Sequence, residues 1–82
     1  MIRVLFLAQL REQLKTAEVT ISSAHVDSIA ALKQQLVNDH PEWEQYIGNT
    51  KLLVAVNHEY AKADSEIKAG DEVAFFPSVT GG

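Results

Sequence analysis

The sequence predicts an α+β domain in which one main helix and a short second helix pack on one face of a mixed β-sheet. Segments with the composition of strands lie toward both ends of the chain, and one stretch with helical spacing of apolar residues lies between them. This order, strands then a helix then strands, is typical of a helix packed on a sheet. The length of 82 residues fits a single domain.

Two strands are predicted in the first quarter of the chain. Ile2–Gln9 and Glu18–Ser22 are rich in β-branched and apolar residues. The polar segment Arg11–Thr16 between them predicts a turn or a helical turn, so we expect the strands to form a β-hairpin. Alternation along the first strand gives it two faces: Ile2, Val4 and Phe6 on one, and Arg3, Leu5 and Leu7 on the other.

The main helix is predicted from Ser28 to Asp39. Ser28 is a favourable N-cap residue, and the apolar residues after it recur at helical spacing on one stripe: Ile29, Leu32, Leu36 and Val37. Pro41 ends this helix, because proline disfavours helical geometry in the residue before it. Proline is tolerated at the first position of a helix, so a short second helix is expected to begin at Pro41.

Three more strands are predicted in the second half. Lys51–Val56 is a nearly continuous apolar run, typical of a strand buried in the centre of a sheet. Glu59–Tyr60 follows the turn at Asn57-His58, and Glu72–Phe76 is the last strand, which Pro77 stops. If the first and last strands pair in the middle, the fold is the β-grasp, the ubiquitin-like architecture.

Composition excludes several classes of function. The net charge is −4 with Lys and Arg scattered singly, which argues against nucleic-acid binding. The absence of cysteine excludes disulfides, thiolate metal sites and a cysteine nucleophile. No stretch approaches the length of a membrane span, and residues 1–10 lack a signal-peptide cleavage site. We therefore expect a soluble, cytoplasmic protein that binds no membrane.

No group of side chains predicts an autonomous enzyme or a metal site. His25, His40 and His58 are far apart in the sequence and have no neighbours suited to metal ligation. Ser78 and Thr80 have hydroxyl groups, but no motif supplies a base to activate them.

The last residues are expected to form a flexible tail, 78–82, after a domain that spans 1–77. From the residues alone, the terminal Gly81-Gly82 is interpreted first as a frayed end. The alternative is a functional carboxylate, because glycine lacks a Cβ and can pass through a narrow channel. A terminal carboxylate is ionised at neutral pH and can act as a nucleophile.

Four segments resemble one family along essentially the whole chain: Met1–Glu12, Ser28–Leu32, Lys51–Asn57 and Lys68–Gly82. The last of these, which ends in Phe-Phe-Pro-Ser-Val-Thr-Gly-Gly, is the most specific. The chain resembles the ubiquitin-like MoaD family, the small, sulfur-carrying subunits of molybdopterin synthase. It departs from the family at Lys15, where members often have glycine, and at Ser78, where many have a second proline.

The resemblance implies a chemical cycle at Gly82. A separate adenylating enzyme would activate this residue with ATP, and a sulfur donor would convert it to a thiocarboxylate, a covalent 1-thioglycine. The sulfur would then pass to cyclic pyranopterin monophosphate in the large synthase subunit, which is expected to carry the catalytic side chains. The assembly would be a heterotetramer of two small and two large subunits, and the small subunit would hold no bound cofactor.

The resemblance also assigns residues to the partner contact. Val79, Thr80 and Gly81 would thread the tail into the partner, and Leu7, Tyr60, Phe76 and Pro77 would form the interface. Two alternatives stay open: a carrier of the same design for thiamine thiazole synthesis or tRNA thiolation, and a non-covalent β-grasp binding module.

Overall fold

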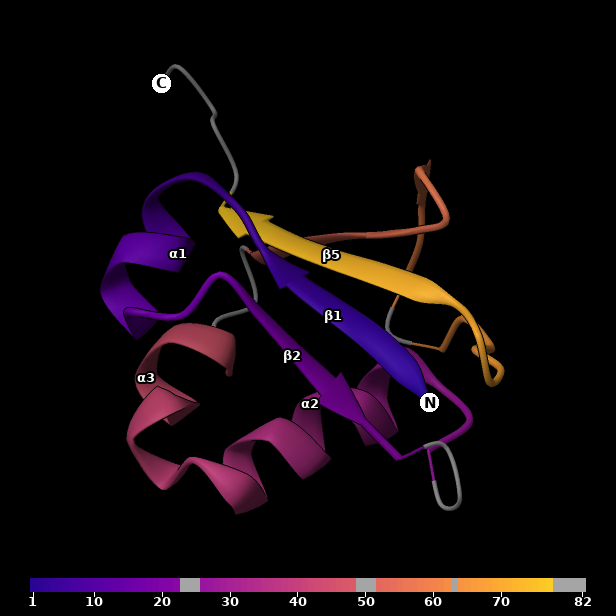
Figure 1. Ribbon diagram of the computed structural model, residues 1–82, viewed down its shortest axis with the longest axis horizontal. Coiled ribbons are helices and arrows are strands. Elements are labelled where there is room, and N and C mark those ends of the chain that lie inside the picture. Colours follow the sequence, from indigo (N-terminus) through magenta and orange to yellow (C-terminus); the bar gives the residue numbers. More distant parts are fainter. Residues whose placement is uncertain (23–25, 49–51, 63, 78–82) are drawn as a thin grey trace.

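The computed structural model describes residues 1–22, 26–48, 52–62 and 64–77. Within this part of the chain, one sheet has the strand order β2-β1-β5-β3-β4 (Figure 1). Only the pairing of β1 with β5 is parallel, and the other neighbours are antiparallel. The first and last strands therefore lie side by side in a mixed sheet, as predicted. The strands are β1 (Ile2–Phe6), β2 (Glu18–Ile21), β3 (Leu52–Val56), β4 (Glu59–Tyr60) and β5 (Glu72–Pro77).

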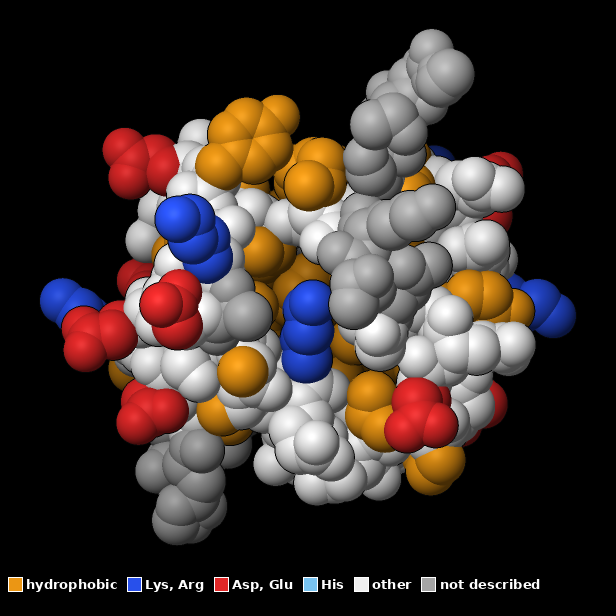
Figure 2. Space-filling view, turned by 180° about the vertical axis from the view of Figure 1, so that it is seen from behind, with side chains coloured by type: hydrophobic (Ala, Val, Ile, Leu, Met, Phe, Trp, Pro, Cys, Tyr) orange, Lys and Arg blue, Asp and Glu red, His pale blue; other side chains and the backbone are white. Residues whose placement is uncertain are grey.

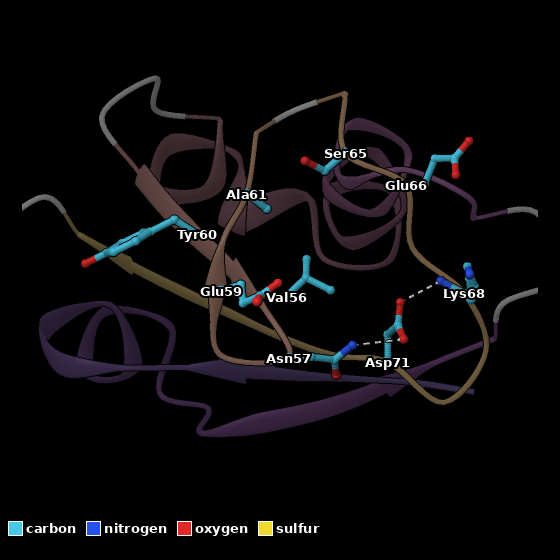
Figure 3. Close-up of a pocket in the computed structure, with 9 residues that line it drawn as sticks. All are labelled: Val56, Asn57, Glu59, Tyr60, Ala61, Ser65, Glu66, Lys68 and Asp71. Carbon is cyan, nitrogen blue, oxygen red and sulfur yellow. Dashed lines mark hydrogen bonds between the residues drawn. The ribbon is translucent and has the colours of Figure 1, made fainter.

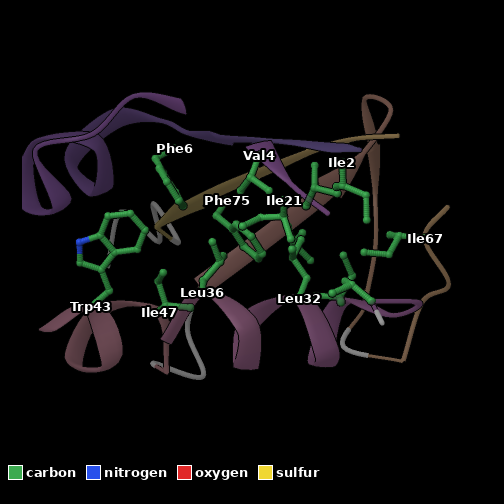
Figure 4. Packing of buried hydrophobic residues seen from close by; sticks show 14 of the residues in the cluster. Ile2, Val4, Phe6, Ile21, Leu32, Leu36, Trp43, Ile47, Ile67 and Phe75 are labelled. Atoms are coloured by element: carbon green, nitrogen blue, oxygen red, sulfur yellow. The ribbon is translucent and has the colours of Figure 1, made fainter. Parts of the chain in front are cut away.

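The main helix is α2 (Ile29–Asp39), which lies with η1 (Pro41–Trp43) and α3 (Glu44–Ile47) against one face of the sheet (Figures 1 and 4). Ser28 caps α2, since its side-chain Oγ accepts a hydrogen bond of 3.2 Å from the Ala31 amide. Pro41 takes the first position of the short helical segment, as expected.

The hydrophobic core fills the space between α2 and the sheet (Figure 4). The inward residues of β1 and β5 are almost completely buried, and so is the predicted apolar stripe of α2 apart from Val37, which is half-buried. Trp43 closes one end of the core, with its ring edge-on to Phe6 at a centroid distance of 5.3 Å. The core residues of these three elements are Ile2, Val4, Phe6, Ile29, Leu32, Leu36, Val73 and Phe75.

The connection after β1 differs from the prediction. The strand ends at Phe6 rather than Gln9, because Ala8 has a φ of 54° that breaks the extended conformation. A helix, α1 (Ala8–Leu14), follows and ends at Lys15, whose φ of 56° and ψ of 32° are left-handed. The strands β1 and β2 pair in antiparallel fashion, but a helix joins them instead of a tight hairpin turn.

The predicted double-sided burial of β3 is wrong. Val54 is buried, but Leu53 is 36% exposed, because among the described residues no helix covers the second face of the sheet. Lys51, where the prediction began this strand, lies outside the described residues. On the neighbouring strand, Pro77 lies opposite Leu52 and belongs to β5, which therefore extends one residue beyond its predicted end at Phe76.

Candidate functional site

The face of the sheet that points away from α2 is charged at one end and apolar at the other. Near one end, Arg3 lies in register with Thr20 and Glu72. Two residues further along β1, the next row has Glu18 on β2 and is apolar across the other four strands: Leu5, Ala74, Ala55 and Tyr60. Leu53 and Phe76 form the row after that. Alternation along each strand places all these side chains on the outer face, because their neighbours are in the core.

Ion pairs occupy the charged end. The Arg3 guanidinium lies 2.6 Å from the Glu18 carboxylate and 3.2 Å from that of Glu72. The hydrogen bond to Glu18 raises the pKa of Arg3, which is fully ionised in any case. His58 Nε2 lies 3.6 Å from Glu72. Arg3, Glu18 and His58 are solvent-exposed and Glu72 is half-buried, so these pairs contribute little to the stability of the fold.

The apolar end of the outer face consists of Leu7, Leu53, Tyr60 and Phe76. Tyr60 is 81% exposed and Leu7 is 42% exposed. The rings of Tyr60 and Phe76 are 6.1 Å apart, and the Leu7 amide donates to the Phe75 carbonyl at 3.0 Å, which places Leu7 beside them. Hydrophobic side chains crowd the upper edge of Figure 2, the edge at which β5 ends in Figure 1. Such a cluster of exposed apolar side chains is typical of an interaction site.

The last described residue, Pro77, is at this apolar end. Strand β5 lies between β1 and β3 and is hydrogen-bonded to both, so its end is held firmly by the sheet. The chain therefore continues toward its C-terminus from the apolar end. The tail residues Val79, Thr80, Gly81 and Gly82, with Ser78, lie outside the described residues.

The turn between β3 and β4 determines where Tyr60 lies. Asn57 and His58 both have left-handed backbones, with φ of 51° and 73°, the geometry of a two-residue hairpin turn. The Asn57 side chain ties this turn to the start of β5: its Nδ2 donates to Asp71 at 3.1 Å, and its Oδ1 accepts from the Glu72 amide at 3.0 Å. The Lys68 amide also donates to Asp71, at 2.8 Å. These hydrogen bonds lower the pKa of Asp71, that of Lys68 contributing most.

The structure brings together Leu7, Tyr60, Phe76 and Pro77, the four residues expected at the interface. Leu53 belongs to the same cluster and was missed, because the apolar run that contains it was interpreted as buried on both faces. The signal that identifies it is alternation from the buried Val54. All five residues are therefore candidates for partner contact.

The described residues hold no group of three or more His, Asp or Glu side chains arranged to bind a metal ion. His40 instead stacks on Trp43 with ring centroids 3.9 Å apart, and His58 is exposed. His25 lies outside the described residues. In the part of the chain that the structure covers, no helix has the length and apolar character needed to cross a membrane.

Comparison with known proteins gives full-length matches. A family model described as the ThiS family matches residues 4–82. The chain is 43% identical over 82 residues to the molybdopterin synthase sulfur carrier subunit of Escherichia coli (strain K12), with all of both chains covered. It is 37% identical, again over the whole of both chains, to the protein of the same name from Haemophilus influenzae.

Solved structures confirm the ubiquitin-like β-grasp fold. Small archaeal modifier protein 1 of Haloferax volcanii has a TM-score of 0.79 and 26% identity, with 95% of this chain and 97% of that chain covered. A putative molybdopterin converting factor, subunit 1, of Pyrococcus furiosus has a TM-score of 0.77 and 25% identity with the same coverage. In both cases the match extends over nearly the whole domain.

Proposed function

This chain belongs to the ThiS family, and we propose that it is the sulfur carrier subunit of a molybdopterin synthase. The observation that carries the proposal is the end-to-end match, at 43% and 37% identity, to two proteins with that name. The Gly81-Gly82 ending and the apolar cluster at the base of the tail fit such a carrier. The partner is then the large synthase subunit, and the catalytic side chains reside there.

The proposed chemistry takes place at the C-terminal carboxylate of Gly82. A carboxylate oxygen attacks the α-phosphorus of ATP on a separate adenylating enzyme, and pyrophosphate leaves. A donor that delivers sulfur at the oxidation level of hydrosulfide displaces AMP and leaves a thiocarboxylate. This sulfur then passes to cyclic pyranopterin monophosphate in the large subunit, and two transfers complete one dithiolene. We propose a cytoplasmic location for this cycle, since ATP is available there.

The fold supports this role because the folded domain, which ends at Pro77, holds the start of the C-terminal tail in a defined position. Because β5 is held on both sides, the position of Pro77 is fixed relative to the apolar end. Six residues from Pro77 to Gly82 reach about 20 Å when fully extended. A partner that covers Leu7, Leu53, Tyr60 and Phe76 therefore has its binding surface next to the point where the tail begins. Burial of the tail in that partner would keep water from the thiocarboxylate.

Carriers for thiamine thiazole synthesis or tRNA thiolation share the same terminal chemistry. The two curated relatives favour the molybdopterin branch, because both match from end to end. A non-covalent binding module would not require Gly82 to be the last residue. The dependence of activity on a free Gly82 carboxylate therefore distinguishes it from a carrier.

The first experiment measures covalent charging. The chain is incubated with the adenylating enzyme, ATP and a sulfur donor, and its intact mass is then taken. We expect exchange of one oxygen for sulfur, confined to the C-terminal peptide. Deletion of Gly82, or addition of one residue after it, is expected to abolish charging without altering the circular dichroism spectrum. Charging that survives either change would contradict the proposal.

The second experiment identifies the pathway. The charged chain is mixed with the large synthase subunit and cyclic pyranopterin monophosphate, and dithiolene formation is measured. Phe76→Ala is expected to weaken binding to the large subunit by about 1–3 kcal/mol, because aromatic anchors dominate interface energies. Glu44→Ala, on the helical side of the molecule, is the control and is expected to have no effect. Failure of the charged chain to support product formation would favour one of the other pathways.

A further inference from the structure

An open groove of about 340 Å³ runs beside β4, between this strand and residues 65–68 (Figure 3). Val56 and Ala61 contribute apolar side chains to the lining, and most of the other lining residues are polar or charged. The groove lies at the edge of the sheet, since β4 is the last strand in the sheet order. The lining residues are Val56, Asn57, Glu59, Tyr60, Ala61, Ser65, Glu66, Lys68 and Asp71.

Among the described residues, the backbone N–H and C=O of Tyr60 have no partner on the neighbouring strand β3. The Ala61 amide donates to the Val54 carbonyl at 3.0 Å, so these two residues form a hydrogen-bonded pair of the antiparallel ladder. Hydrogen-bonded and non-hydrogen-bonded pairs alternate in such a ladder, which makes Tyr60 and Ala55 a non-hydrogen-bonded pair. The N–H and C=O of Tyr60 therefore point away from β3. An edge of this kind accepts an added extended segment.

The charges of the groove select a basic occupant. Glu59 belongs to β4 and Glu66 to the segment that faces it across the groove (Figure 3). Both are exposed, and their carboxylates form none of the ion pairs seen among the described residues. Asp71 adds a third carboxylate, and Lys68 is the one cation in the lining. Three carboxylates and one ammonium leave two negative charges on a chain whose net charge is already −4. Complementary charge across an interface speeds association and gives specificity.

The groove is continuous with the apolar end through Tyr60. The ring of this residue lies 6.1 Å from Phe76, while the same residue lines one end of the groove (Figure 3). A protein that covers the apolar end and contacts Tyr60 is therefore positioned to reach the groove. We therefore expect the occupant of the groove to be a segment of the same partner that receives the C-terminal tail.

We propose that this groove holds an extended segment of the large synthase subunit that bears Lys or Arg side chains. The inference rests on the proposed function, which identifies that subunit as the partner. The segment lies along β4, hydrogen-bonds to the Tyr60 backbone, and directs its basic side chains toward Glu59 and Glu66. The apolar end then supplies most of the binding energy, and the groove supplies recognition of the correct partner.

The test uses two double charge reversals that change the net charge equally. Glu59→Lys with Glu66→Lys alters the groove, and Glu42→Lys with Glu44→Lys alters the helical side of the molecule. Each takes the net charge from −4 to 0, because two replacements of −1 by +1 add four charges. All four side chains are exposed, so both variants are expected to fold, and circular dichroism checks this.

Affinity for the large subunit is measured by calorimetric titration at low and high salt. The groove variant is expected to bind about tenfold more weakly at low salt, with a smaller difference at high salt, because exposed charges are screened. The control variant is expected to match the original chain. Equal affinities of the two variants would overturn the groove inference. If the original chain itself does not bind the large subunit, the proposed function fails together with the groove inference. Equal binding of the two variants contradicts the groove inference alone, so the two outcomes are distinguishable.

Discussion

The side chain of Asn57 holds the β3–β4 turn against the start of β5, and its removal is expected to destabilise the fold. Its two hydrogen bonds, to Asp71 and from the Glu72 amide, contribute about 0.5–1.5 kcal/mol each. The left-handed backbone at this position costs a residue with a Cβ about 1–2 kcal/mol, and Asn tolerates it better than Ala. Asn57→Ala is therefore expected to lower the free energy of unfolding by about 2–3 kcal/mol.

A second variant, Asn57→Gly, separates the two contributions. Glycine removes the same hydrogen bonds but adopts positive φ without strain. It is expected to lose about 1–2 kcal/mol, less than the alanine variant. Urea denaturation at pH 7 measures both values, with the one tryptophan, Trp43, as the fluorescent reporter of the core. If Asn57→Gly is as stable as the original chain, the hydrogen bonds do not stabilise the turn and this reasoning is refuted.

The same variants have a defined pH dependence. The pKa of Asp71 in the folded chain is lowered from its ordinary value of 3.8 by hydrogen bonds from the Lys68 amide and Asn57. A lowered pKa stabilises the fold at pH values above 3.8, and this contribution is lost as the pH falls through the lower, folded-state value. The difference between the original chain and Asn57→Ala is therefore expected to shrink in acid. An unchanged difference between pH 7 and strongly acidic solution would contradict the role of Asp71.

Two further predictions concern the helices. Lys15→Gly is expected to raise the free energy of unfolding by about 0.5–1 kcal/mol, since Lys15 is exposed and has a left-handed φ of 56°. Gln13→Gly, within the same helix, is expected to lower the free energy of unfolding by about 1 kcal/mol. Thermal denaturation measures both variants, and a shift of the melting temperature in the same direction for both would contradict this interpretation. Leu36→Ala is expected to lower the free energy of unfolding, measured by urea denaturation, by about 2–5 kcal/mol, because Leu36 is fully buried. Gln34 is exposed, so Gln34→Ala is expected to change this free energy by less than about 0.5 kcal/mol.

Local signals in the sequence identified the main helix and most of the sheet. The Ser28 cap, the apolar spacing from Ile29 to Leu36 and the stop before Pro41 depend on neighbours only a few residues away. The alternation in Glu72–Phe76 likewise places Phe76 on the outer face and Phe75 in the core. Such features are encoded locally, so the sequence alone is sufficient to predict them.

Errors arose where the backbone takes a conformation that composition does not reveal. Ala8 and Lys15 are ordinary helix-compatible residues, yet both have positive φ, and these values end β1 and then α1. A glycine at either position would have given a visible signal. The segment Arg11–Thr16 was therefore predicted as a turn or a helical turn rather than as part of the helix α1, and the connection from β1 to β2 as a hairpin.

By itself, the sequence determined the fold class, the glycines at the C-terminus and the family, because each follows from local pattern or from residues compared one by one. Only the tertiary structure decided that Leu7, Leu53, Tyr60 and Phe76 form one apolar end at the base of the tail. These residues come from four segments, and the strand order and register set which of them become neighbours. The groove beside β4 depends on the same long-range pairing, since a sheet edge exists only once the strand order is fixed.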